Sequence, residues 1–192
     1  MTEEPVTVDE LADKAESYLH ESSLTPEEYE ALKHSVAELS PLLTTDRTYF
    51  VLGSYGRPEI HRLQLVKDRL NRRADSYAFL MVDIRSEWTN TYLKFRLLAD
   101  YAVFIVGVTE HDGGGFLVEQ GYFTAIEEYF EKTHVFKRTY ENLAPADVDT
   151  GVDLENPYSG MQTAIFDMLS DADRLCDWET ETELHECANS LP

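Results

Sequence analysis

A glutamate follows a run of glycines in the middle of the chain, where a loop is expected to pass into a helix. Gly113, Gly114 and Gly115 allow the backbone to bend closely, and Glu119 falls in the first turns of the helix that follows. A carboxylate on a helix can attack a carbon atom or stabilise positive charge that develops on it. Glu119 is therefore the candidate catalytic residue, and Asp112 and the three glycines are candidate substrate-binding residues. Because the helix dipole stabilises an acidic residue near any helix N-terminus, a purely structural role stays open.

A strand must position this loop and helix. Residues 101–108, YAVFIVGV, form a nearly unbroken apolar and β-branched run directly before it. This composition is typical of a strand buried on both faces of a parallel sheet. The carboxyl ends of parallel strands open onto a ligand crevice, so we expect the crevice here.

A second strand, residues 49–53, leads into a short glycine-containing loop and then a helix over residues 60–73. The loop can touch a phosphate or sugar through its backbone amides and Arg57. Its other interpretation is a turn that needs permissive glycines, because the segment is neither a Walker loop nor a dinucleotide fingerprint. The candidate substrate-binding residues here are Gly53, Ser54, Gly56 and Arg57.

Two further candidates follow a third strand, residues 77–82. Asp83 comes directly after this strand, so it either binds ribose hydroxyls in the crevice or caps the following turn. Trp88 lies in the polar loop beyond it and either stacks on a nucleobase or packs on the domain.

The segment from Gly115 to Tyr122, GFLVEQGY, follows the apolar strand and resembles the nucleoside 2-deoxyribosyltransferase-like enzymes. The same layout is similar to TIR domains, whose NAD-cleaving members carry a glutamate on the corresponding helix. The resemblance spans residues 48–137, about half the chain. It implies a flavodoxin-like fold in which Glu119 attacks the anomeric carbon of a deoxyribosyl group, with Tyr55 from the first loop against the substrate. Asp83, from its place at the end of a strand, is a further candidate catalytic residue.

The implied activity is cleavage of an N-glycosidic bond, or deoxyribosyl transfer, on a nucleoside, a nucleotide or NAD. No cofactor and no metal ion are expected, and a homodimer is expected because the related transferases complete their pockets from a neighbour. The alternative is a non-catalytic nucleotide-sensing or protein-interaction domain of the same fold. Phe116 favours this alternative, because it stands where the family has a small hydroxyl residue, and so does Gly113, which stands where the family has an aspartate.

The spacing of strands and helices predicts the fold class. Strands over 48–53, 77–82, 101–108 and 133–137 alternate with helical stretches, which indicates a three-layer α/β sandwich with a mainly parallel, flavodoxin- or Rossmann-like sheet. We assign this domain to residues 47–170. The connection over 139–156 is expected to cover the crevice, and a helix is expected to begin at Asn156-Pro157.

The two ends of the chain are predicted to differ from this domain. Residues 1–46 form a helical hairpin, because Thr7 and Thr25 each precede a glutamate by three residues, as in a capping box. Pro41 is expected to close the second helix. Residues 171–192 are read as an acidic tail that frays, and Cys176 and Cys187 there fit neither a disulfide scaffold nor a zinc site.

Charge bounds the function further. The chain has 37 acidic and 16 basic residues, for a formal net charge of −21. This excess argues against nucleic acid as a partner and is typical of cytoplasmic proteins of salt-loving organisms. No apolar run is long enough to cross a bilayer and the N-terminus lacks a signal sequence, so no membrane partner and a cytoplasmic location are expected. One cationic island interrupts the acidity, and its members are Arg62, Lys67, Arg69, Arg72 and Arg73. These side chains bind either a phosphate, an acidic neighbouring subunit or acidic residues of the same domain.

Overall fold

The computed structural model describes residues 7–19, 23–85, 90–112, 117–143 and 152–192. At its centre is a five-stranded, all-parallel sheet with the strand order β2-β1-β3-β4-β5. The strands are β1 (Arg47–Gly53), β2 (Ser76–Phe79), β3 (Phe104–Thr109), β4 (Thr133–Arg138) and β5 (Leu175–Trp178). The predicted α/β class with a parallel sheet is therefore confirmed.

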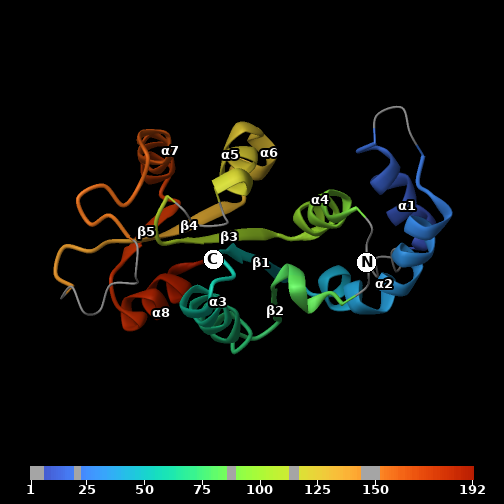
Figure 1. Ribbon diagram of the computed structural model, residues 1–192. Coiled ribbons are helices and arrows are strands. Elements are labelled where there is room, and N and C mark those ends of the chain that lie inside the picture. Colours follow the sequence, from blue (N-terminus) through green and yellow to red (C-terminus); the bar gives the residue numbers. More distant parts are fainter. Residues whose placement is uncertain (1–6, 20–22, 86–89, 113–116, 144–151) are drawn as a thin grey trace.

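Helices cover both faces of the sheet, which gives three layers (Figure 1). One face carries α4 (Thr91–Tyr101), α5 (Leu117–Ala125), α6 (Glu127–Phe130) and α7 (Gly160–Asp171). The other carries α3 (Arg57–Leu70) and α8 (Glu181–Ser190). Alternate residues of β1 serve the two cores: Phe50 packs under α4 and α5, whereas Tyr49 and Val51 pack under α3 and α8. Since both faces are covered, β1 is apolar at nearly every position.

The N-terminal helices precede this domain and pack beside α4 (Figure 1). They are α1 (Val8–Glu16) and α2 (Pro26–Thr44), and both begin with the predicted capping box. Leu11 of α1 and Leu39 of α2 belong to the same apolar core as Phe50. The prediction that Pro41 ends the second helix is wrong, because α2 continues to Thr44. A proline this close to the end removes one donor but leaves the last turn able to form.

The prediction of a frayed tail beyond Asp171 is also wrong. Residues 175–178 pair with β4 as the edge strand, and α8 packs beside α3 on the same face of the sheet. Trp178 is 1% exposed, so the tail supplies part of the core. Cys176 and Cys187 form a disulfide that joins β5 to α8, which corrects the expectation that they would not pair.

Several element boundaries differ from the sequence prediction. The strand β2 stops at Phe79, and Met81–Asp83 form a short 3₁₀ helix. The helix α7 begins at Gly160, not at Asn156-Pro157, because Ser159 and Gln162 form its capping box. Across the described residues, no helix has the length and apolarity that crossing a membrane requires.

Candidate functional site at the carboxyl edge of the sheet

The strand order places a topological switch point between the carboxyl ends of β1 and β3. These two strands are neighbours at the centre of the sheet, and the chain leaves them toward opposite edges, to β2 and to β4. Ligands of parallel α/β sheets bind at such a switch point. Gly53 ends β1 here, and a Cβ atom on it would lie 2.7 Å from the Val108 carbonyl oxygen. This glycine is therefore required by the close approach of the two strands.

Glu119 lies in the first turn of α5 and lines a hollow of about 220 Å³. The other walls are apolar or aromatic, apart from one threonine: Met81, Thr91, Tyr92, Phe95 and Tyr122. Glu119 Oε2 is buried and has no hydrogen-bond partner among the described residues. Burial accordingly raises the pKa of the Glu119 carboxyl, although a hydrogen bond to its own backbone opposes the shift. The hollow thus combines an apolar wall with a poorly solvated acid.

Tyr55, from the loop after β1, faces the same region. Burial raises the pKa of its hydroxyl to about 12, and the charges of Asp83 and Glu119 add to the shift, against a hydrogen bond with the Met81 backbone. The residue is still 40% exposed. Tyr55 is therefore a protonated hydroxyl within electrostatic reach of both carboxyls, although it does not belong to the residues that line the hollow.

Asp83 is engaged by the protein itself. Its carboxylate accepts a hydrogen bond from the Leu80 amide at 2.8 Å and forms an ion pair with Lys67 at 3.0 Å. Of the two interpretations of Asp83, the structure contains the turn-capping contact. The side chain remains 33% exposed, beside Tyr55.

The remaining predicted residues are distributed around the same edge. Ser54 is half-buried, Gly56 is the N-cap of α3 and Arg57 is exposed at its first position. Asp112 is exposed, and its amide donates to the Pro157 carbonyl at 2.8 Å. The predicted residues Trp88, Gly113, Gly114 and Gly115 lie outside the described residues.

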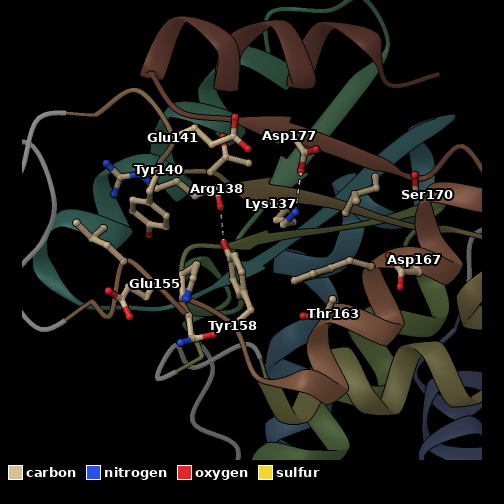
Figure 2. A pocket seen from close by; sticks show the side chains of 16 residues that line it. Lys137, Arg138, Tyr140, Glu141, Glu155, Tyr158, Thr163, Asp167, Ser170 and Asp177 are labelled. Carbon is tan, nitrogen blue, oxygen red and sulfur yellow. Dashed lines mark hydrogen bonds and ion pairs between the residues drawn. The ribbon is translucent and has the colours of Figure 1, made fainter.

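Most of the connection expected to cover the crevice, residues 144–151, lies outside the described residues, but Tyr158 just beyond it contacts the ends of β3 and β4. The Tyr158 hydroxyl donates to the carbonyls of Thr109 at 3.1 Å and Arg138 at 2.8 Å. A larger cavity of about 530 Å³ opens beside Tyr158, between β4, β5 and α7 (Figure 2). Its charged walls carry both signs, and Lys137 is paired with Asp177 at 3.5 Å. The two cavities share no lining residue, so this one is separate from the Glu119 hollow.

The sequence analysis missed a buried ionic cluster at the ends of β3 and β4. Glu110 is 4% exposed and pairs with Arg62 of α3 and with Arg138 at 3.0 Å. Both arginines lie over the Trp178 ring. A charged residue directly after an apolar strand was the signal for Glu110.

Of the interpretations of the cationic island, the structure contains the pairing with local groups. Besides Arg62, Lys67 pairs with Asp83, and Arg73 donates to the carbonyls of Asn189 and Leu191. The island is thus largely used for internal contacts.

A second carboxylate was also missed. Glu59, in the first turn of α3, lies 3.6 Å from His111 of the loop after β3, measured from Oε1 to Nε2. Glu59 Oε2 is buried and, like Glu119 Oε2, has no hydrogen-bond partner in the described part of the chain. In that part there is also no group of three His, Cys, Asp or Glu residues able to hold a metal ion.

Comparison with known proteins places the chain in a family. A family model described as a family of unknown function (DUF8170) matches residues 5–164, and the chain belongs to that family. Neither the curated proteins nor the solved structures gave a match. The family match includes the N-terminal hairpin and the Glu119 hollow.

Proposed function

We propose that this member of a family of unknown function cleaves an N-glycosidic bond, or transfers the deoxyribosyl group, of a nucleoside-type substrate. Glu119 acts in this proposal as the nucleophile or as the group that stabilises positive charge at the anomeric carbon. One observation carries the proposal: Glu119 Oε2 is buried without a partner among the described residues, at the wall of a hollow formed by α4, α5 and the 3₁₀ helix after β2.

The electrostatics of Glu119 suit this chemistry. Burial raises the pKa of its carboxyl, so the ionised form is poorly solvated in the free protein. Positive charge that develops on the sugar during bond cleavage compensates for the missing solvation. The interaction is therefore stronger in the transition state than with the bound substrate, which is the condition for catalysis.

The size and walls of the hollow suit one ring of a nucleoside. Pockets for drug-sized ligands measure about 300 to 1,000 Å³, whereas this one measures about 220 Å³. Phe95 and Tyr122 give it aromatic walls, and Tyr92, which also lines it, is 48% exposed. Aromatic faces of this kind stack on a base or on the apolar face of a sugar.

The proposed reaction has two steps. A Glu119 oxygen bonds to the anomeric carbon while the bond from that carbon to the base nitrogen breaks, and the base leaves with the electron pair and takes up a proton. A water molecule, or a second base, then attacks the same carbon and releases Glu119. Tyr55, whose pKa of about 12 keeps its hydroxyl protonated, donates a hydrogen bond that orients the Glu119 carboxylate or the ligand.

Base release tests the proposal. The protein is incubated in concentrated KCl with deoxynucleosides, their monophosphates and NAD, and free base is measured by chromatography. We expect release with at least one substrate, and we expect Glu119→Gln to lower it by about 10³-fold or more, since this variant keeps the shape of the side chain but cannot bond to carbon.

The matched control is Glu127→Gln, which removes an exposed carboxylate from the next helix, α6. We expect this control to release base at the rate of the wild type. Equal activity in Glu119→Gln would remove Glu119 from the mechanism, and no release from any substrate would contradict the proposed activity as a whole.

A second candidate function is non-catalytic nucleotide sensing on the same fold. The contacts of Asp83 favour this candidate. Lys67 and the Leu80 amide already bind the Asp83 carboxylate, so it is less available as a second catalytic acid beside Glu119. Ligand binding by calorimetry together with absent base release would support this candidate over the enzyme.

A further inference from the structure

One arginine supports the wall of the Glu119 hollow. Tyr92, Phe95 and Tyr122 line the hollow, and Arg96 directly follows Phe95 on α4. The Arg96 guanidinium donates a hydrogen bond to the Tyr92 hydroxyl at 3.2 Å, and its central carbon lies 5.4 Å from the centre of the Tyr122 ring. Arg96 therefore contacts both tyrosines of the wall, although it does not line the hollow itself.

The two tyrosines of the wall depend on such a contact for their arrangement. Tyr92 is 48% exposed, and its ring meets the Tyr122 ring edge to face, with 6.5 Å between the ring centres. An exposed side chain on a helix samples several rotamers unless a specific contact selects one. The hydrogen bond from Arg96, together with the attraction of the guanidinium to both rings, selects the rotamers that form the wall.

The N-terminal hairpin holds Arg96 in this position. The ring of Tyr18, just after α1, has its centre 4.2 Å from the guanidinium carbon, closer than the rings of Tyr92, Tyr122 and Tyr129. The Tyr18 hydroxyl donates to Asp100, which lies one turn after Arg96 on α4. Tyr18 is thus fixed at its ring and at its hydroxyl. One guanidinium consequently contacts the hairpin and the wall of the hollow at once.

We propose that Arg96 and Tyr18 are positioning residues of the Glu119 hollow: the Tyr18 ring holds the guanidinium, and the guanidinium holds the tyrosine wall that keeps water from Glu119. The residues that line the hollow come from α4, α5 and the 3₁₀ helix, so the hairpin acts on the hollow through these contacts and not by forming part of it. This inference rests on the proposed function in that the hollow is the ligand site. Such support fixes the shape of a site before the ligand arrives.

The titration of Glu119 tests the inference without a ligand. The carboxyl carbons of ¹³C-labelled glutamate side chains are followed by NMR against pH at one fixed KCl concentration, and Glu119→Gln identifies the signal. We expect Tyr18→Ala and Arg96→Met to shift the raised pKa of Glu119 most of the way back to its ordinary value of 4.5, because water then reaches the carboxyl. Burial and a backbone hydrogen bond are what shift this pKa, so its change reports access of water and not the loss of the Arg96 charge.

Two further variants separate the stacking on Arg96 from general loosening of the hairpin. Tyr18→Phe keeps the ring on the guanidinium and loses only the hydroxyl that donates to Asp100, so Glu119 should titrate as in the wild type. Tyr29→Ala is the matched control, because it truncates a tyrosine whose hydroxyl donates to Asp9 within the hairpin at 2.9 Å. It should also leave the Glu119 titration unchanged. Thermal unfolding of all variants confirms that they fold.

Base release gives a second measurement with the substrate that the wild type cleaves best. We expect Tyr18→Ala and Arg96→Met to raise KM by about tenfold and to change kcat by about threefold or less, because both variants retain the Glu119 carboxyl. Glu119→Gln should show the opposite pattern, in which the loss is in kcat.

The inference is overturned if Glu119 titrates at its ordinary pKa already in the wild type, or if Tyr18→Ala and Arg96→Met leave its raised pKa unchanged. It is also overturned if Tyr29→Ala shifts this pKa as much as Tyr18→Ala does. Failure of the proposed reaction has a different outcome: the Glu119 titration responds to Tyr18→Ala and Arg96→Met, yet no substrate releases free base. NMR titration and base release therefore decide the two proposals separately.

Discussion

Glu119 destabilises the folded chain under the conditions in which its carboxylate would be used. Burial raises the pKa of this carboxyl from the ordinary value of 4.5. The folded state therefore binds more protons at this position than the unfolded state does at pH values above 4.5. The free energy of unfolding consequently falls as the pH rises from 4.5 through the raised pKa, and it stays lower above that pKa.

Replacement of Glu119 by glutamine should therefore stabilise the protein at neutral pH. We expect Glu119→Gln to raise the free energy of unfolding by about 1 kcal/mol at pH 7, a figure limited by the partial exposure of the side chain, and to leave it nearly unchanged at pH 4. Urea denaturation at both pH values measures this difference. Glu127→Gln, on the exposed side of α6, should stay within about 0.5 kcal/mol of the wild type. A large loss of stability in Glu119→Gln at pH 7 would mean that the carboxylate has an ionic partner.

The sequence allowed part of the site to be predicted at the level of single residues. The position of Glu119 at the start of a helix followed from the apolar strand and the glycines before it, whereas Tyr55 was named from the family resemblance of the first loop. Glu59 was not foreseen, because its placement depends on a backbone turn at Gly56 and on His111, which comes from another strand end. A short linear pattern carries no information about that contact.

At the scale of elements, one carboxylate attaches the N-terminal hairpin to the α/β domain. Asp100 of α4 accepts hydrogen bonds from the hydroxyls of Tyr18, just after α1, and Tyr129 of α6. It also pairs with Lys14 of α1 at 3.0 Å. Burial acts to raise the pKa of Asp100, but the bonds from Tyr129, Tyr18 and Lys14 outweigh it and lower the pKa. The stability from these contacts is present above the ordinary value of 3.8 and is lost as the pH falls through the lowered pKa.

Loss of the Asp100 carboxylate should loosen α1 selectively. Asp100→Ala leaves two half-buried tyrosine hydroxyls without their acceptor, so we expect a loss of about 2 to 3 kcal/mol in the free energy of unfolding. Amide exchange in α1 should become faster while exchange in β3 stays protected. Asp13→Ala, on the exposed side of α1, is the control and should change neither quantity. Equal acceleration in α1 and β3 would contradict a local role.

The elements themselves were predictable where the pattern was long or strongly apolar. Both capping boxes of the hairpin lie where the sequence indicated, and the strand predicted over 133–137 is observed over 133–138. The strand predicted over 101–108 begins three residues later, at Phe104, because α4 continues to Tyr101. The strand β5 and the helix α8 were missed because a four-residue edge strand among acidic residues has no distinct pattern. These two elements are stabilised by burial of Trp178 in the core and by the disulfide that joins them.

At the scale of the whole molecule, internal contacts increase the acidity of the surface. The formal net charge is −21, and several of the 16 basic residues, among them Arg62, Lys67 and Arg73, are bound to groups within the fold. The remaining surface therefore carries carboxylates that repel one another. Dissolved salt screens such repulsion, whereas it affects the buried Glu110 cluster much less.

Stability should accordingly rise with salt concentration. We expect the midpoint of thermal unfolding to increase by about 10 °C or more between 0.1 and 2 M KCl, because the Debye length falls from about 10 Å to below 3 Å over this range. Differential scanning calorimetry across a KCl series measures it, and a series in sucrose separates screening from general exclusion of the solute. A midpoint that does not depend on KCl would contradict adaptation of the surface to salt.

The parallel topology has a consequence for how the chain reaches its native state. The central pair, β1 and β3, joins Tyr49 to Phe104, and no two neighbouring strands are linked by a tight hairpin. A large entropy of loop closure opposes this pairing before any stabilising contact is gained, so sheet assembly is expected to be the slow phase of refolding. The α1–α2 unit needs only the closure of a short loop. In a stopped-flow experiment, the circular dichroism of helices should therefore appear well before the fluorescence change that reports packing of the aromatic core.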